Sequence, residues 1–315
     1  DRLRALLQHR EVSEIGHQLF PHETFPSHTV LERRLVERFA DALALLWQYL
    51  SPPRDRLFAV QAMRLQVENL KVILRHCQSG VRVPAGALPV IPLPEPFQWT
   101  EIESTERRKP AEILDAIPEP ALRASATEAL VMFSATPVPL YLEAGLDRGY
   151  FALLTEAVSR LSASDRRDVE PLVEMEREVH NLMFVLRARV HHGIEPEAVI
   201  SLAARSSGRG EPPTWVLGAA REEGVRDIVG RAPRSISGLL AEVPPQLPAI
   251  ERALWQRYYG RANRLYYRTF FTVGCLHGFV AVKRMELANL ITAVEAVRYG
   301  LTVEQTAKRM LRPSG

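Results

Sequence analysis

The sequence Met285-Glu286-Leu287-Ala288-Asn289-Leu290 decides how the chain is interpreted, because a similar stretch occurs three times. Its counterparts are Gln66-Val67-Glu68-Asn69-Leu70 and Glu178-Val179-His180-Asn181-Leu182. The asparagines are separated by 181 − 69 = 112 and 289 − 181 = 108 residues. A glycine follows each asparagine by eleven or twelve residues, at Gly80, Gly193 and Gly300.

A second motif precedes each asparagine in register. A glutamate lies 37 or 38 residues upstream, with a proline six residues before it, a leucine three residues after it and an aromatic residue seven after it. The three sets are Pro26, Glu32, Leu35 and Phe39; Pro137, Glu143, Leu146 and Tyr150; and Pro245, Glu251, Leu254 and Tyr258. Several features in register predict a threefold internal repeat of roughly 110 residues.

The apolar residues around each asparagine predict a helix. Val67, Leu70 and Leu74 lie at i, i+3 and i+7, which places them on one helical stripe. The other copies have the same spacing, through Val179, Leu182 and Leu186, and through Leu287, Leu290 and Val294. We expect each asparagine, at the edge of its stripe, to bond the end of a neighbouring helix. A solvated surface asparagine is the alternative, and the glycines are expected to end the helices.

No stretch shows the alternation of a strand, so the predicted class is all-α. The predicted units are residues 1–83, residues 84–205 and residues 206–315. Helices are expected over residues 1–20, 31–50 and 121–135, and two short helices are expected after the break at 206–213. Thr302 is expected to be an N-cap. The prolines of the connector predict an extended loop, at Pro84, Pro89, Pro92, Pro94 and Pro96.

Composition excludes several classes of protein. Of 315 residues, 40 are basic and 37 acidic, and no basic run is interleaved with aromatics, so no nucleic-acid partner is predicted. Cys77 and Cys275 lie in different copies, without the spacing of a disulfide framework or a zinc site. The longest uncharged apolar stretch, 269–282, is too short to span a membrane. No signal peptide is visible, so a cytoplasmic location is expected.

The candidate chemical motifs favour structural roles. His180 occupies a position that holds Glu68 and Ala288 in the other copies, which disfavours catalysis, and His191-His192 suits a helix C-terminus. The stretch Gly208-Arg209-Gly210 lacks the Lys-Ser/Thr of a phosphate-binding loop. Glu174, Glu176 and Glu178 alternate along a helix with Arg177, which is typical of a solvated face. The Phe270–Gly274 stretch is interpreted as core. No catalytic, metal or cofactor site is therefore predicted.

The combination of motifs resembles a known family. Three helical copies each open with Glu-x-x-Leu-x-x-x-aromatic, as in Glu143 to Tyr150, and close with Asn-Leu and a later glycine. The third copy, from Phe279 to Gly300, is the most similar. This pattern resembles the central-stalk subunit of V-type and archaeal-type ATPases that is called C in prokaryotes and d in eukaryotes. The resemblance extends from about Arg2 to Leu311, with departures at Gln66 and at Met183-Phe184.

The resemblance implies three helical bundles around a pseudo-threefold axis, arranged as a funnel. It also implies a rotor adapter, on the cytoplasmic face of the membrane, that links the central axle to the ring of membrane subunits. Such a subunit transmits torque and has no active site, nucleotide, cofactor or small-molecule substrate. The repeat-motif residues would then be structural, including Glu178 and Glu286 before the second and third asparagines.

Two other hypotheses stay open on sequence alone. A free-standing helical-repeat scaffold that binds other proteins would share the repeat but would not associate with a rotary ATPase. A small-molecule enzyme that uses its histidines would require a pocket with converging polar groups.

Overall fold

The computed structural model describes residues 5–6, 8–9, 11–81, 83, 88–92, 109–205, 210–268 and 271–312. Within these ranges every regular element is a helix and no strand is found, so the predicted all-α class is confirmed. None of the helices described is both long enough and apolar enough to span a bilayer.

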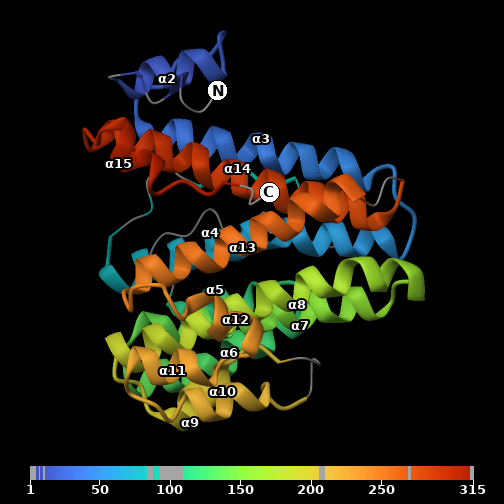
Figure 1. The fold of residues 1–315 in the computed structure, drawn as a ribbon, viewed down its shortest axis with the longest axis vertical. Helices are drawn as coiled ribbons and strands as arrows, with labels where there is room; N and C mark the ends of the chain where they lie inside the picture. The colour runs from blue at the N-terminus through green and yellow to red at the C-terminus, as the bar shows by residue number, and fades with distance from the viewer. Residues whose placement is uncertain are drawn as a thin grey trace.

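Six long helices form the body of the molecule (Figure 1). They are α3 (His28–Trp47), α4 (Arg54–Ser79), α7 (Pro139–Ser159), α8 (Ala163–Leu186), α13 (Leu247–Arg268) and α14 (Val273–Arg298). Short turns join them into three hairpins in chain order, α3–α4, α7–α8 and α13–α14. Each hairpin carries one motif glutamate on its first helix and one motif asparagine on its second.

The hairpins pack in a cyclic order. Helix α4 of the first hairpin contacts α7 of the second, and α8 of the second contacts α13 of the third. Helix α14 then returns to contact α3 of the first hairpin, so residues from opposite ends of the chain lie side by side (Figure 1). Each hairpin therefore contacts both of the others.

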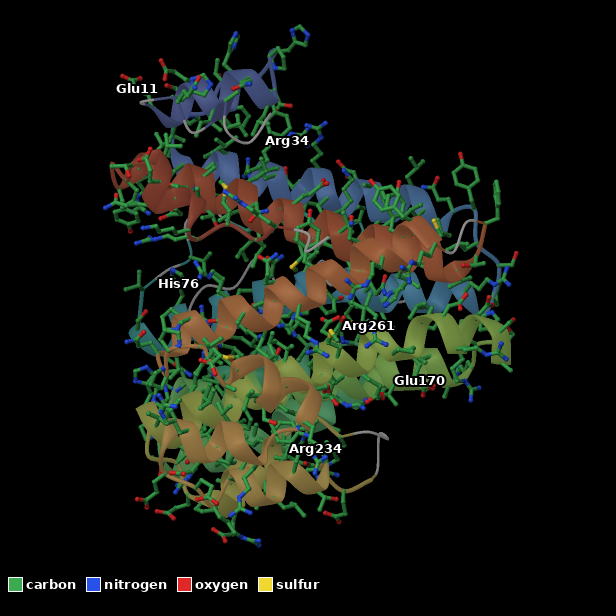
Figure 2. All side chains as sticks on the ribbon, viewed as in Figure 1. Glu11, Arg34, His76, Glu170, Arg234 and Arg261 are labelled. Atoms are coloured by element: carbon green, nitrogen blue, oxygen red, sulfur yellow. The ribbon has the colours of Figure 1, made fainter. Side chains whose placement is uncertain are left out.

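Shorter elements cover the ends of this body. They are α2 (Val12–Leu19), α5 (Pro110–Asp115), α6 (Pro120–Ala135), the π-helical turn η1 (Arg187–His191), α9 (Pro196–Leu202), α10 (Thr214–Ala219), α11 (Val225–Arg231), α12 (Arg234–Leu240) and α15 (Val303–Ala307). Helix α2 packs on α3 and α14, and α6 packs along α7. Exposed charged side chains such as Glu11 and Arg234 lie on the outer surface of this layer (Figure 2).

Local sequence signals set where the long helices begin and end. Ser27, Ser162 and Thr272 are the N-caps of α3, α8 and α14, and each side-chain hydroxyl accepts a backbone N–H three residues later. The three repeated glycines follow the asparagine helices with φ of 67°, 59° and 63°, a left-handed conformation that suits glycine. Their predicted role as helix stops is confirmed.

Several predicted boundaries are wrong. Residues 1–20 do not form one helix, because the described residues 8, 9 and 11 are not helical. The Glu11 backbone N–H donates to the Glu14 carboxylate, so α2 begins there as a separate helix. Three short helices, α10 to α12, follow the break instead of two. The prediction for Thr302 is confirmed, since it caps α15 and Gln305 completes the capping box.

The proline connector and the aromatic turn each lie partly outside the described residues. Pro89 and Pro92 have no regular structure, whereas Pro84, Pro94 and Pro96 lie outside the described residues. Phe271 is fully exposed and is therefore not core, although Val273 and Gly274 after it are buried. Its φ of 63° turns the chain so that the ring points into solvent. The neighbouring Phe270 lies outside the described residues.

Candidate functional site

The three motif asparagines make closely similar contacts. Asn181 is fully buried; its side-chain amide donates to the Ala204 carbonyl at 2.9 Å and its carbonyl accepts the Ala204 N–H at 2.8 Å. Asn289 makes the same pair of bonds to the backbone of Leu311, both at 2.8 Å. Asn69 donates to the Pro89 carbonyl at 3.0 Å. Each asparagine therefore binds the backbone of a residue 20 to 23 positions downstream. In the first copy that residue is Pro89, which has no backbone N–H to donate to the asparagine carbonyl.

Replacing one of these asparagines tests how much the contact stabilises. Asn289→Leu should lower the free energy of unfolding by about 1–3 kcal/mol, because the backbone groups of Leu311 lose their partner inside the protein. Asn263 on α13 is the chain's only asparagine outside the motif, and the structure describes no side-chain hydrogen bond for it. Chemical denaturation of Asn263→Leu supplies the matched control, and equal costs for the two variants would contradict the role of the bonds.

Most of the other repeat-motif residues are buried. The leucines at Leu35, Leu146 and Leu254 are buried, as are the aromatic rings of Phe39, Tyr150 and Tyr258. Leu70 and Leu182 are buried, and Leu290 is half-buried and packs against the core. Burial raises the pKa of the half-buried Glu178 above its usual range. Glu286 is on the surface of α14, 2.7 Å from Lys283.

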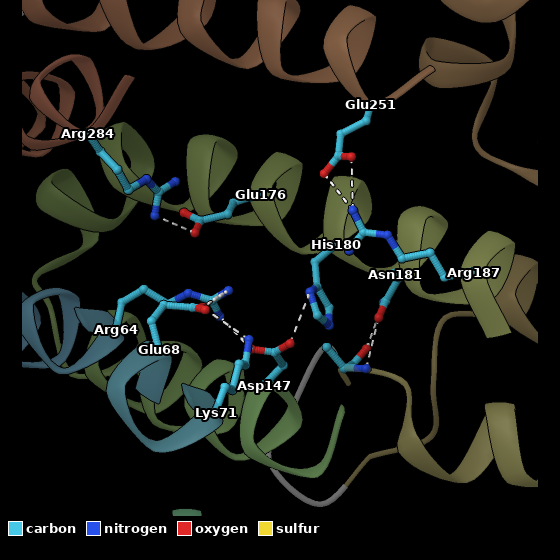
Figure 3. Close-up of polar contacts among 11 residues, drawn as sticks. Arg64, Glu68, Lys71, Asp147, Glu176, His180, Asn181, Arg187, Glu251 and Arg284 are labelled. Carbon is cyan, nitrogen blue, oxygen red and sulfur yellow. Dashed lines mark hydrogen bonds and ion pairs between the residues drawn. The ribbon is translucent and has the colours of Figure 1, made fainter. Parts of the chain in front are cut away.

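The motif glutamates lie between hairpins rather than within them. The Arg75 guanidinium of α4 donates to Glu143 of α7 at 2.6 Å. Arg187, in the turn that extends α8, binds both oxygens of Glu251 of α13 at 2.8 and 2.9 Å (Figure 3). Glu32 of α3 differs, since the charged groups that face it are those of α14.

A cluster of charged side chains lies between the long helices, where the sequence suggested a solvated face. We define the buried charge cluster by five residues: Arg64, Lys71, Asp147, Glu176 and Arg284 (Figure 3). Three of its members are almost completely buried, namely Lys71, Asp147 and Glu176. The earlier expectation for Glu176 and Arg177 is wrong, because both side chains are inside. Arg177 instead pairs with Glu174 one turn earlier on α8.

Asp147 of α7 joins the first two hairpins. It lies 2.6 Å from the Lys71 ammonium and 2.7 Å from the Arg64 guanidinium, both on α4. Burial alone would raise the pKa of this carboxyl, but the two cations outweigh it and hold the pKa well below its usual range. Glu68, which is half exposed, completes the neutralisation of these two cations at 2.8 and 3.0 Å.

Glu176 of α8 joins the second and third hairpins. Its carboxylate accepts from Arg284 of α14 at 2.7 Å and from the Tyr258 hydroxyl of α13 at 3.2 Å. Arg284 also donates to the Tyr258 oxygen at 3.1 Å, so the three groups form a closed triangle. Burial raises the pKa of Glu176, but the charges of Arg284 and Arg64 lower it by a larger amount. The pKa therefore lies below its usual value.

Two histidines lie buried next to this cluster. Burial lowers the pKa of His180 to about 4, and burial likewise lowers the pKa of His277 to about 4. Among the described residues, neither Nε2 atom has a hydrogen-bond partner, while Nδ1 of His277 faces the Gln61 amide. Both rings are therefore neutral at physiological pH.

This arrangement favours cohesion over reaction chemistry. Asp147 and Glu176 are poor bases because fixed cations neutralise them. One open cavity lies between α6 and α7 beside Arg148, and another lies among α11, α12 and α13; neither is lined by a histidine. Within the described part of the chain, no three His, Cys, Asp or Glu side chains are grouped to hold a metal ion.

The repeat could have revealed part of this cluster. Arg64, Glu176 and Arg284 each precede a motif asparagine by five residues, since 69 − 64, 181 − 176 and 289 − 284 all equal 5. One acid between two arginines at equivalent positions is a signal for a shared ionic contact. Lys71 and Asp147 have no such signal, because the other copies place uncharged residues at the corresponding positions: Met183 and Ile291, and Val36 and Trp255.

Comparison with known families places the whole chain in one of them. A family model described as ATP synthase (C/AC39) subunit matches residues 2–309. Among curated proteins, none matches the chain.

Proposed function

The chain belongs to the ATP synthase (C/AC39) subunit family, and from that premise we propose that it is the central-stalk rotor adapter of a V- or A-type ATPase. In this role it links the central axle to the rotor ring in the membrane and transmits torque between them. It acts as a peripheral protein on the cytoplasmic face, without an active site, cofactor or small-molecule substrate of its own.

The cyclic packing of the hairpins carries this proposal. Helices α4 and α7, α8 and α13, and α14 and α3 make the same kind of contact in turn, which supports a pseudo-threefold arrangement of three bundles. The near-equivalent bonds of Asn69, Asn181 and Asn289 support it independently. A funnel built on such an axis, divided at about residues 83 and 205, can present one end to a many-fold ring and the other to an axle.

Torque transmission requires that the three bundles move as one body. The buried charge cluster supports this, because Asp147 and Glu176 bond across hairpin boundaries at distances below 3 Å. Breaking such a buried ion pair costs several kcal/mol, since a charge is left without a partner. Sliding of one hairpin against another is therefore opposed by ionic contacts as well as by the apolar core.

Co-purification from membranes tests the adapter role. A tagged chain should recover ATPase activity and a small ring-forming membrane subunit when it is captured from gently solubilised membranes of the source organism. Recovery of neither, with the tagged protein folded, would contradict the adapter role and favour the free-standing helical scaffold.

Phe271→Gly makes this experiment more specific. The exposed Phe271 adopts a left-handed conformation that is costly for an aromatic residue, and such strain often marks a functional contact. Glycine relieves the strain, so this variant should be as stable as the parent or more so, yet recover at least about threefold less partner protein. Val131→Ala removes another exposed apolar side chain, on α6, and is the control. Equal recovery by both variants would exclude Phe271 from the interface.

A further inference from the structure

One of the three boundaries between hairpins differs in charge from the other two. Six residues after each motif asparagine, the chain carries Arg75, Arg187 and Glu295, since 75 − 69, 187 − 181 and 295 − 289 all equal 6. The two arginines bind the motif glutamates of the next hairpin, at 2.6 Å for Glu143 and 2.8 Å for Glu251. At the boundary of α14 with α3, a glutamate replaces the arginine and faces another glutamate.

We call the contact between α3 and α14 the closing seam. The motif glutamate in this seam is Glu32, which is half-buried on α3 and lies within hydrogen-bonding reach of the Glu295 carboxyl. Oxygen Oε1 of Glu32 is buried and, among the described residues, has no hydrogen-bond donor. Two carboxylates this close cannot both be ionised without a cost, whereas one shared proton supplies the missing donor.

Arg298 is the cation with the main effect on Glu32 among the described residues. Arg298 of α14 lowers the pKa of Glu32, but it also binds Glu295 at 3.2 Å and so divides its charge between the two acids. Burial, together with the hydrogen bond and charge of Glu295, raises the pKa of Glu32 to about 7. Helices α2 and α4 also pack against α3, but the charged groups with the main effect on Glu32 both lie on α14.

We propose that the closing seam is a proton-dependent latch, in which a proton shared by Glu32 and Glu295 replaces the arginine–glutamate pair of the other two boundaries. The seam is tight while the proton is held and weakens when it is lost. The closing seam is also the one boundary whose two hairpins are not consecutive in the chain, so the latch controls whether the cycle of hairpins is closed. This inference rests on contacts within the chain and does not depend on the adapter role.

The direction of the effect follows from linkage. A carboxyl whose folded pKa lies above its unfolded value stabilises the folded state most at pH below about 4.5, and this contribution is lost as pH rises through about 7. The folding equilibrium constant should therefore fall by up to about tenfold per pH unit while that proton is released. His180 and His277 act in the opposite direction, because the unfolded chain protonates them as pH falls through about 6.5, so the test uses pH 6.5 and above and compares variants that share both histidines.

The test compares stability at pH 6.5 and pH 8.5 in chemical denaturation of the full chain. Relative to variants without the acid pair, which keep the same histidines, the parent protein should lose stability over this interval. Glu295→Arg, which restores the residue type of the other boundaries, should remove the loss. Glu295→Gln is a second, less invasive variant, which supplies an amide donor to Glu32 and should also remove it. Arg75→Glu creates the same acid pair at Glu143 and should add a second loss.

Local exchange separates the latch from general stability. Amide hydrogen exchange in α3 and α14, corrected for its intrinsic pH dependence, should speed up from pH 6.5 to 8.5 more than exchange in α7 and α8. Arg298→Gln should shift the midpoint of this change to higher pH, because it removes the cation that opposes protonation. A difference between the parent protein and the Glu295 variants that stays constant with pH would overturn the proposal. So would a pH-dependent loss that persists unchanged in both Glu295 variants.

Discussion

Asp147→Asn is expected to lower the free energy of unfolding by about 3–5 kcal/mol, because it leaves the two cations with only the half-exposed Glu68 as a counter-charge. Lys71 is almost fully buried and lies 2.6 Å from this carboxylate, so it cannot move to water without repacking α4. Arg64 keeps Glu68, but its short contact to Asp147 is lost. Asparagine has nearly the same shape, so the cost measures charge rather than volume.

Glu143→Gln is the matched control for this variant. Glu143 lies one helical turn before Asp147 on the same helix, and it too pairs with α4, through Arg75. The Arg75 side chain is 54% exposed, so its charge can be solvated when the partner is removed. Loss of that pair should cost at most about 1 kcal/mol. Equal costs for the two variants in urea denaturation would show that the buried charge cluster is solvated and does not bind the hairpins together.

Acidification is expected to produce the second large effect, through the two buried histidines. Their pKa is about 4 in the folded protein and about 6.5 when unfolded, so the unfolded chain takes up protons first as pH falls. The histidine contribution to stability is therefore present above pH 6.5 and is lost progressively down to about pH 4. A shift of this size corresponds to about 3 kcal/mol for each histidine.

His277→Gln isolates this contribution. Glutamine cannot be protonated in this range, and its carbonyl can still accept from the Gln61 amide. From pH 7 to pH 4.5 the unfolding free energy of the variant should rise by about 2 kcal/mol relative to that of the parent protein. Glu32 and Glu178 have raised pKa values and act in the opposite direction, but they are common to both proteins and cancel. A constant difference across this range would mean that His277 is not held neutral.

The periodic features of the sequence predicted much of the helical framework. Apolar spacing and the glycine stops located the asparagine helices, because helix formation and termination depend on residues within a few positions. The limits of this approach are visible at residues 1–20, where the Glu11–Glu14 capping contact divides the expected helix. Propensity alone could not distinguish a continuous helix from two short ones.

The polar contacts were harder to predict. The sequence suggested a bond for each asparagine but not its partner, because Ala204 and Leu311 contribute backbone groups that every residue carries. Glu176 was taken for a solvated residue because its neighbours Glu174 and Glu178 share its charge. Its burial depends on Arg284, which lies 108 residues further along the chain. Such pairs can be found in a single sequence only when a repeat aligns them.

The contact of α3 with α14 also determines the order in which this protein can be completed during synthesis. Helix α3 leaves the ribosome 226 residues before α14 begins, as 273 − 47 gives, and at about 5–20 residues per second this delay is roughly 10–50 s. During that time α3, with its buried Leu31 and Leu35, lacks one of the helices that pack against it in the complete fold. The first hairpin is therefore the part of the nascent chain that most needs protection, by a chaperone or by α2, until the last helix arrives.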